Sequence, residues 1–487
     1  MAPSVAIIGA GFGGLCMAIR LQRAGIDSYT VFEKAGDLGG TWRDNSYPGA
    51  GCDIPSHLYS YSFEKYASWT RRYPAQPEIL GYLEHCADKY DVRRKIRFGT
   101  EVTRATFDGT RWQVTTADGT EPFDVVVMSV GQLNRPRLPD IPGMSDFEGV
   151  SFHSARWNHD HDLTGRRVAV IGNGSSAAQL IPTLAERAAH LDVFQRTPNW
   201  VIPKPDATFG PLTKLAFHYV PGLQRAYREW IYRYAETTLY PALARGWSGG
   251  LLKKRALDHL RAQVPDPALR AKLTPGYPPG CKRVVIDSAF YPALTRPNVD
   301  VVTDRIVRIQ PKGVETTEGL READTIVYAT GFRSTEFLAP MEVTGLGGQS
   351  LAERWSGGAE AYLGISVPGF PNLFLLYGPN TNLGHNSIIY MIECQVNHVM
   401  ACLREVAGRG PIEVRPEVMA AWNRQLDAAM ARMVWGDGCQ SWYKTAEGRV
   451  TNNWPGPTTL YRRLTAKPPG PAYRAIGRVA SSVSRTD

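Results

Sequence analysis

Two segments of the chain share one pattern, in which an apolar strand is followed by a Gly-rich turn, a helix and a second strand. The first segment spans residues 4–34, and the second begins at Arg167. A short apolar run that ends at glycines is typical of a strand inside a parallel sheet. Because this unit occurs twice, the sequence predicts an α/β protein with two Rossmann-like, dinucleotide-binding domains.

The remaining segments alternate between strand and helix patterns. We expect a helix and short strands within 77–130, strands within 299–309 and 325–329, and a helix over 386–403. Helical periodicity predicts a helical insertion over 205–280, within the second domain.

The domain boundaries follow from these patterns. We expect the first domain to comprise residues 1–140 and 335–487, and the second domain to comprise residues 141–334. A Pro-rich bridge at 135–142 marks the passage between them. The tail after Lys467 contains Pro, Ser and Arg and is expected to be mobile.

Composition fits a soluble enzyme. The chain has 487 residues, of which 43% are hydrophobic and 21% charged, as expected for two or three globular domains. The net charge of +9 comes from scattered basic residues, so anionic cofactors explain it better than nucleic acid does. A signal peptide is not expected, because the first strand begins almost at once, and the longest weakly charged stretch, 361–392, is interrupted by Pro and Gly. We therefore expect a cytoplasmic protein without a transmembrane segment.

Cysteine spacing argues against a metal site or a redox dithiol. The seven cysteines are Cys16, Cys52, Cys86, Cys281, Cys394, Cys402 and Cys439. No two have CxxC spacing, so no metal is predicted. An odd number of widely spread cysteines is typical of a protein from the reducing cytosol.

The two Gly-rich turns differ in the residue that ends the following strand. The first turn consists of Gly9, Ala10, Gly11, Phe12, Gly13 and Gly14, and the second of Gly172, Asn173, Gly174, Ser175, Ser176 and Ala177. Glu33 follows the first unit, and Arg196 takes the corresponding place in the second. An acid there favours a free ribose 2′-hydroxyl, whereas a cation accommodates a 2′-phosphate. The first turn therefore suits FAD and the second suits NADPH.

Further residues are predicted to contact the cofactors. Beside the two turns, the predicted contacts are Glu33, Lys34, Gly40, Thr41, Trp42, Asp53, Tyr59, Arg196, Thr197, Lys282, Ala329, Thr330, Gly331 and Asn386. A Gly-rich turn with an aromatic, at 39–42, is suited to line a flavin ring. Asn386 and its neighbour His385 are either flavin contacts or helix caps.

Three motifs carry a resemblance to a known family. Residues 147–157 read Phe-Glu-Gly-Val-Ser-Phe-His-Ser-Ala-Arg-Trp, and this spacing resembles the FxGxxxHxxxW fingerprint of type I Baeyer–Villiger monooxygenases. Residues 39–53 resemble the pattern GGxWxxxxYPGxxxD, and Lys282-Arg283 resembles a Lys-Arg pair of these enzymes. The family usually has Pro or Asp after the final tryptophan, where this chain has Asn158.

The resemblance implies an activity. NADPH would reduce FAD, and the reduced flavin with O2 would form a C4a-peroxyflavin that attacks a ketone, giving an ester or lactone. Arg283 would be the catalytic cation, paired with Asp53, and Lys282 would join Arg196 on the 2′-phosphate. Trp442 resembles a tryptophan near the nicotinamide and substrate, although a core tryptophan is the alternative. His153 and Trp157 would couple the domains.

Three other functions remain possible from the residues alone. A related flavin monooxygenase would oxidise sulfur or nitrogen, but Arg283 and Trp157 argue against it. A pyridine-nucleotide:disulfide reductase is disfavoured because the chain lacks CxxC. A non-catalytic protein that binds a partner or membrane is suggested only by the aromatic and basic stretch at 227–234. The particular ketone and the oligomeric state are not predictable from the sequence.

Overall fold

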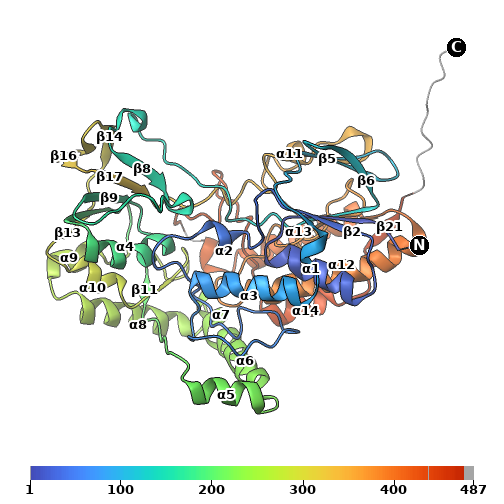
Figure 1. Cartoon of the computed structure of the whole chain (residues 1–487), viewed down its shortest axis with the longest axis horizontal. Helices are drawn as coiled ribbons and strands as arrows, with labels where there is room; N and C mark the ends of the chain where they lie inside the picture. Colours follow the sequence, from blue (N-terminus) through green and yellow to red (C-terminus); the bar gives the residue numbers. More distant parts are fainter. Residues whose placement is uncertain (1, 437, 477–487) are drawn as a thin grey trace.

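Two five-stranded parallel sheets organise the molecule (Figure 1). The computed structural model describes residues 2–436 and 438–476. The first sheet has the order β19-β7-β1-β2-β3, with bounds Leu373–Leu375, Val125–Met128, Val5–Ile8, Tyr29–Phe32 and Ile96–Arg97. The second has the order β13-β10-β9-β17-β8, with bounds Val299–Val302, His190–Phe194, Arg167–Ile171, Thr325–Tyr328 and Val150–His153. The predicted α/β fold is confirmed.

The first sheet is covered on both faces, because alternate side chains of a strand point to opposite faces. Val5 and Ile7 belong to a core shared with helices α1 (Phe12–Arg23), α3 (Gln76–Lys89) and α12 (Ile388–Arg409). Ala6 and Ile8 face a smaller sheet with the order β18-β4-β5-β6. That sheet is formed by Glu342–Thr344, Arg104–Phe107, Trp112–Thr116 and Gly119–Phe123.

The second sheet repeats this plan. Val168 and Val170 pack against α4 (Ser175–Arg187) and α10 (Phe290–Leu294). Ala169 and Ile171 face a three-stranded sheet of β14, β15 and β16. Its strands are Ile306–Gln310, Gly313–Thr316 and Gly319–Glu322. Each strand–turn–helix unit thus has one face on helices and the other on a small sheet.

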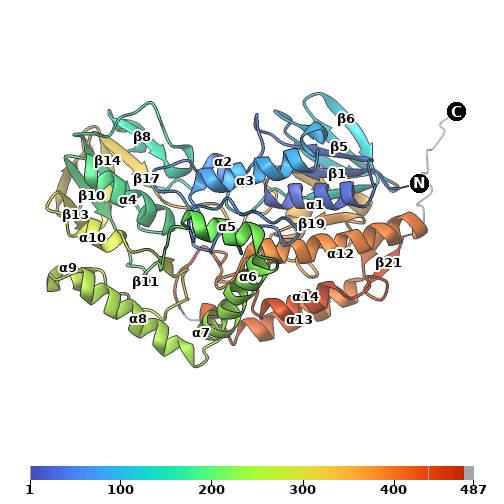
Figure 2. The same cartoon turned by 60° about the horizontal axis from the view of Figure 1, so that its bottom comes forward.

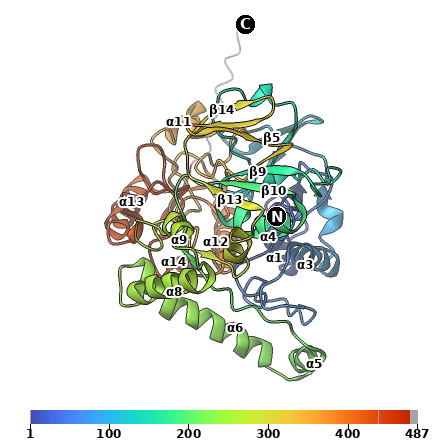
Figure 3. The same cartoon turned by 90° about the vertical axis from the view of Figure 1, so that its left-hand side faces the viewer.

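Only helices occur between β11 (Val201–Ile202) and β12 (Val285–Ile286). They are α5 (Pro211–Tyr219), α6 (Leu223–Tyr234), α7 (Tyr240–Leu243), α8 (Ser248–Gln263) and α9 (Pro267–Lys272). Figures 2 and 3 show α5, α6 and α8 together below the two sheets. Arg228 of α6 donates to the carbonyl oxygens of His57 at 2.7 Å and Ser60 at 2.9 Å, so this helix is attached to the first domain.

The C-terminal region differs from its prediction. The chain continues through α13 (Pro416–Met430) and α14 (Thr458–Thr465). Strand β21 (Tyr473–Ala475) then pairs antiparallel with β20 (Ile412–Val414), and Tyr473 is buried. The expected mobility after Lys467 is therefore wrong up to residue 476, because an aromatic side chain anchors this strand, and the rest of the tail lies outside the described residues. Within the described parts of the chain, none of the helices combines the length and apolarity needed to cross a bilayer.

Candidate active site

Two glycines of the turn after β1 have no room for a side chain. Gly9 has a φ of +103°, and a Cβ on it would lie 2.5 Å from the carbonyl oxygen of Ser129. A Cβ on Gly14 would lie 1.9 Å from the carbonyl oxygen of Gly9. Helix α1 begins after Gly11 without a side-chain cap. Backbone N–H groups at its N-terminus are therefore free to bind a phosphate group.

A cavity of about 340 Å³ adjoins this turn. Its lining includes these predicted flavin contacts: Gly9, Gly11, Phe12, Gly13, Glu33, Lys34, Gly40, Thr41, Trp42 and Tyr59. The lining combines apolar side chains, a helix N-terminus and a carboxylate. This combination fits a ligand with a flat ring system and a pyrophosphate.

Glu33 follows β2 and is held firmly by the backbone. Its Oε2 accepts from the N–H of Ala10 at 2.9 Å, and its Oε1 accepts from the N–H of Ala35 at 3.0 Å. The guanidinium of Arg43 also donates to Oε1, at 3.1 Å. Each carboxylate oxygen can accept two hydrogen bonds. Oε2 accepts from Ala10 and therefore keeps a lone pair for a ribose hydroxyl.

Sequence reasoning missed part of the lining of this cavity. The missed lining residues include Arg43, Asp44, Thr100, Val102, Ser129, Gln132 and Arg333. Arg43 directly follows Trp42 and could have been included, whereas Thr100 and Val102 belong to no motif. Asn386, expected as a flavin contact or a helix cap, is absent from the lining; its Oδ1 accepts from the N–H of Ser387 and its Nδ2 donates to Oε1 of Glu236, both at 2.8 Å. Glu236 lies in the π-helix Ala235–Leu239 between α6 and α7, which local spacing could not reveal.

The second Gly-rich turn repeats the geometry of the first. Gly172 has a φ of +118°, and a Cβ there would lie 2.4 Å from the carbonyl oxygen of Ala329. Ala329 follows β17, so Thr330 and Gly331 leave the sheet beside this turn. Helix α4 begins after Gly174, again without a side-chain cap, and Ser175 and Ser176 form its first turn.

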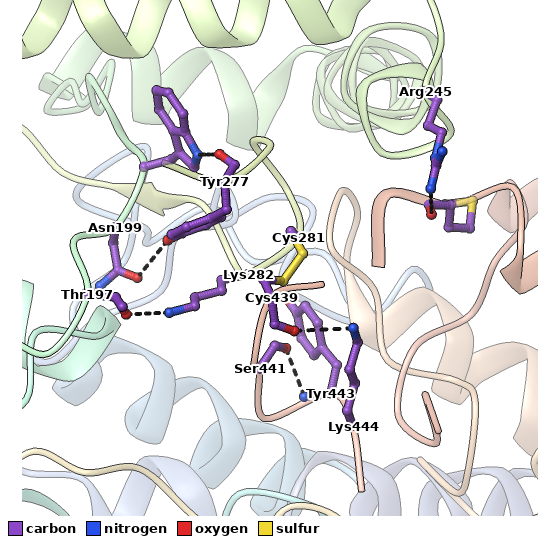
Figure 4. Close-up of a disulfide and its surroundings, with 12 residues drawn as sticks. Thr197, Asn199, Arg245, Tyr277, Cys281, Lys282, Cys439, Ser441, Tyr443 and Lys444 are labelled. Atoms are coloured by element: carbon purple, nitrogen blue, oxygen red, sulfur yellow. Dashed lines mark hydrogen bonds between the residues drawn. A yellow bond between two sulfur atoms is a disulfide. The ribbon is translucent and has the colours of Figure 1, made fainter. Parts of the chain in front are cut away.

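Two cations lie close together near this turn. Nζ of Lys282 donates to Oγ1 of Thr197 at 2.5 Å and lies 4.9 Å from the ring centre of Tyr277 (Figure 4). The pKa of Lys282 is lowered by burial and, secondarily, by the positive charge of Arg196. Among the described residues, neither cation has an ion-pair partner. An anion bound here would relieve this repulsion.

Arg283 and Asp53 form a bidentate ion pair. Nη2 of Arg283 lies 2.7 Å from each carboxylate oxygen of Asp53, and its Nε donates to Oδ2 at 3.1 Å. Nη1 donates to the carbonyl oxygen of Leu383 at 3.4 Å. The carboxylate raises the pKa of Arg283 well above its ordinary value, so the guanidinium is permanently charged. The predicted pairing is present, and it joins residues 230 positions apart.

The segment before Asp53 contacts helix α4 of the second domain. The hydroxyl of Tyr47 donates to Oε1 of Gln179 at 2.8 Å, and Nε2 of Gln179 donates to the carbonyl oxygen of Gly51 at 2.9 Å. A Cβ on Gly49 would lie 2.2 Å from the carbonyl oxygen of Gln179, so the two backbones are in close contact. This contact holds Asp53 at the junction of the two domains.

Removing the Tyr47 hydroxyl should weaken this junction. We expect Tyr47→Phe to lower the free energy of unfolding by about 1 kcal/mol, since Oε1 of Gln179 then loses its buried donor. Urea unfolding followed by flavin fluorescence measures the change. Tyr234→Phe is the control, because its side chain is 42% exposed and should leave stability unchanged. Equal stabilities of Tyr47→Phe and wild type would contradict the role of this bond.

His153 and Trp157, which were predicted to couple the two domains, have different surroundings. His153 ends β8 and is buried, and its Nδ1 accepts from the N–H of Ala155 at 3.1 Å. Burial lowers the pKa of His153, which favours the neutral ring. The ring of Trp157 packs edge-on against Phe152, with centroids 5.1 Å apart. Trp442 packs beside Tyr443, in an apolar cluster with α7.

A disulfide corrects the expectation from cysteine spacing. Cys281 and Cys439 are bonded although 158 positions separate them (Figure 4). The other five cysteines are free and buried. Spacing along the chain did not reveal the pair, because the fold alone brings these two loops together.

Comparison with known proteins agrees with this geometry. A family model described as pyridine nucleotide-disulphide oxidoreductase matches residues 6–220, which include both Gly-rich turns. A Baeyer–Villiger monooxygenase from Streptomyces coelicolor is 44% identical over 470 residues, covering 95% of this chain and 91% of the relative. A solved structure of an oxidized steroid monooxygenase bound to NADP has a TM-score of 0.86 and 32% identity, covering 98% of this chain and 100% of that chain. The structure of OTEMO in complex with FAD and NADP has a TM-score of 0.87 and 28% identity, covering 97% of this chain and 100% of that chain.

Two nucleotide-binding turns with a charged arginine between their domains define a flavoprotein oxidoreductase with two dinucleotide sites. Identity across almost the whole chain narrows this class to the monooxygenases. The chain belongs to the Baeyer–Villiger monooxygenase family.

Proposed function

We infer that the chain is an NADPH- and O2-dependent flavoprotein monooxygenase that inserts one oxygen atom beside a ketone carbonyl, giving an ester or lactone. FAD, when bound and reduced by NADPH, supplies the activation of O2. The observation that carries this proposal is the Arg283–Asp53 pair, which lies where the two domains meet. We also propose the cytoplasm as its location.

Arg283 is the proposed catalytic cation. Oxygen insertion into a ketone builds negative charge on oxygen, first on the attacking atom and then on the former carbonyl oxygen. A permanently charged guanidinium stabilises that charge without giving up a proton. The bonds from Nε to Oδ2 and from Nη2 to both carboxylate oxygens of Asp53 fix the plane of the guanidinium, so no reorganisation is needed during the reaction.

Other predicted site residues are proposed to bind the two nucleotides. The N-terminus of α1 and Glu33 are proposed to hold the pyrophosphate and ribose of FAD, with Trp42 along its ring system. The N-terminus of α4 is proposed to hold the pyrophosphate of NADPH. Arg196, Lys282 and Thr197 are proposed to hold its 2′-phosphate, an anion that would offset the charges of Arg196 and Lys282.

A panel of ketones tests the proposed reaction. Purified protein should be yellow, should lose that colour on anaerobic addition of NADPH, and in air should convert at least one linear, cyclic or aromatic ketone into a product heavier by one oxygen atom. Mass spectrometry with ¹⁸O2 identifies the source of that atom. Oxidation of NADPH that yields only hydrogen peroxide with every ketone, while a sulfide is oxidised, would overturn ketone oxidation as the activity.

A further inference from the structure

The disulfide lies between two segments that carry proposed site residues. Cys281 directly precedes Lys282 and Arg283, and Cys439 lies on the segment that leads to Tyr443. Figure 4 shows Lys282 reaching from the disulfide toward Thr197, and Tyr443 lying on the side of Cys439. Cys281 is therefore one peptide unit from the proposed 2′-phosphate cation and two from the proposed catalytic cation.

The Cys439 segment has polar contacts of its own and lies next to an apolar cluster that includes Leu243, Val434 and Tyr443. Nζ of Lys444 donates to the carbonyl oxygen of Cys439 at 3.2 Å, within the same segment. The hydroxyl of Ser441 accepts from the N–H of Tyr443 at 3.1 Å, also within it. Gly280 packs closely against Leu243, where a Cβ would lie 2.5 Å from its Cδ2. The disulfide is the covalent tie between the Cys439 segment and the loop that carries Lys282.

The local chemistry favours these two sulfurs over the other five. The free cysteines are buried, and burial raises the pKa of Cys16, Cys52, Cys86, Cys394 and Cys402, which makes their thiols unreactive. Cys281 is also buried, but Cys439 is partly exposed, so a reagent can reach the disulfide through the sulfur of Cys439. A disulfide in a cytosolic protein is typically transient or redox-sensing, which fits the location proposed above.

We propose that Cys281 and Cys439 form a reversible redox site that sets the affinity of the enzyme for NADP. As a disulfide they hold the Lys282–Arg283 segment against the Cys439 segment, and as two thiols they release it. Hydrogen peroxide oxidises the two thiols, and the reaction gives one disulfide and two water molecules. A dithiol reverses it by exchange, donating two electrons and two protons. This inference rests on the proposed NADPH site.

The first measurement counts thiols in wild-type protein. Denatured, unreduced protein should react with five equivalents of a thiol reagent, in line with the five free cysteines, and reduced protein should react with two more. Peptide mass spectrometry should recover the cross-linked peptides containing Cys281 and Cys439. Seven reactive thiols in protein treated with hydrogen peroxide would overturn the proposal.

The second measurement follows NADP⁺ binding to the FAD-loaded protein. After treatment with dithiothreitol and its removal by gel filtration, the dissociation constant should rise on the order of fivefold, at the lower end of typical coupling between sites. Treatment with hydrogen peroxide should restore it. Cys281→Ser and Cys439→Ser should both show the weaker binding and no longer respond to either reagent. Cys402→Ser is the matched control, since it removes a buried free thiol and should respond like wild type.

The outcomes separate this proposal from the proposed reaction. Equal NADP⁺ affinities of oxidised wild type, with five free thiols, and reduced wild type, with seven, would overturn the redox site. This comparison does not depend on the folding of any variant. A reversible change in affinity without conversion of any ketone would support the redox site and count against the activity. No binding of NADP⁺ in either state would instead refute the NADPH site itself.

Discussion

Arg283→Ala should lower the rate of ketone conversion by about two to three orders of magnitude while NADPH still reduces the flavin. Removing a single preorganised group that stabilises a developing oxyanion typically costs this much in kcat. Hydride transfer builds no such charge beside Arg283, so the reductive half-reaction should change little. Anaerobic stopped-flow measurement of flavin bleaching and chromatographic measurement of the ester give the two rates separately.

Two further variants show whether charge or geometry is responsible. Arg283→Lys keeps the charge but lacks the planar fork, so it should recover only part of the rate. Asp53→Asn leaves the cation but removes the opposite charge that holds it, and should give an intermediate loss. Arg305→Ala is the matched control, because it removes an exposed arginine of the second domain. Wild-type ketone conversion by Arg283→Ala, with full FAD content, would refute the catalytic role.

The parts of the site that could be predicted from the sequence are local. Gly9 and Gly172 have no room for a Cβ beside Ser129 and Ala329, respectively. Both could be recognised from the sequence because the strand, the turn and the helix of each unit are consecutive in the chain. The contrast between Glu33 and Arg196 is equally local, since each ends the strand that follows its turn. Predicting these features required only the hydrophobic periodicity of single strands and helices.

The parts that could not be predicted depend on loops brought together by the fold. No spacing rule connects Cys281 with Cys439, and the resemblance to a family, not the chain pattern, paired Arg283 with Asp53. The contact of Asn386 with Glu236 is likewise not predictable from spacing, because Glu236 lies in the π-helix between α6 and α7, 150 positions away in the chain.

Arg196→Ala should raise the KM for NADPH about tenfold to a hundredfold and leave the KM for NADH unchanged. A charge-assisted hydrogen bond to phosphate contributes roughly 1.5–3 kcal/mol, and 1.4 kcal/mol corresponds to a factor of ten. NADH lacks the 2′-phosphate, so it loses nothing when the cation is removed. Steady-state kinetics with both coenzymes, at one ionic strength, measure the ratio.

Lys282 makes this prediction sharper, because its ammonium lies near Arg196 and both are proposed to contact one phosphate. Lys282→Met should raise the KM for NADPH in the same direction. The double variant should lose less than the product of the two single losses, because each single variant also loses the relief of repulsion that the phosphate provides, and the double variant loses this relief only once. Arg296→Ala, which removes an exposed arginine of the same domain, should change neither coenzyme's KM. Equal increases for NADPH and NADH in Arg196→Ala would mean that this arginine does not read the phosphate, and the assignment of the second nucleotide as NADPH would then lose its main support.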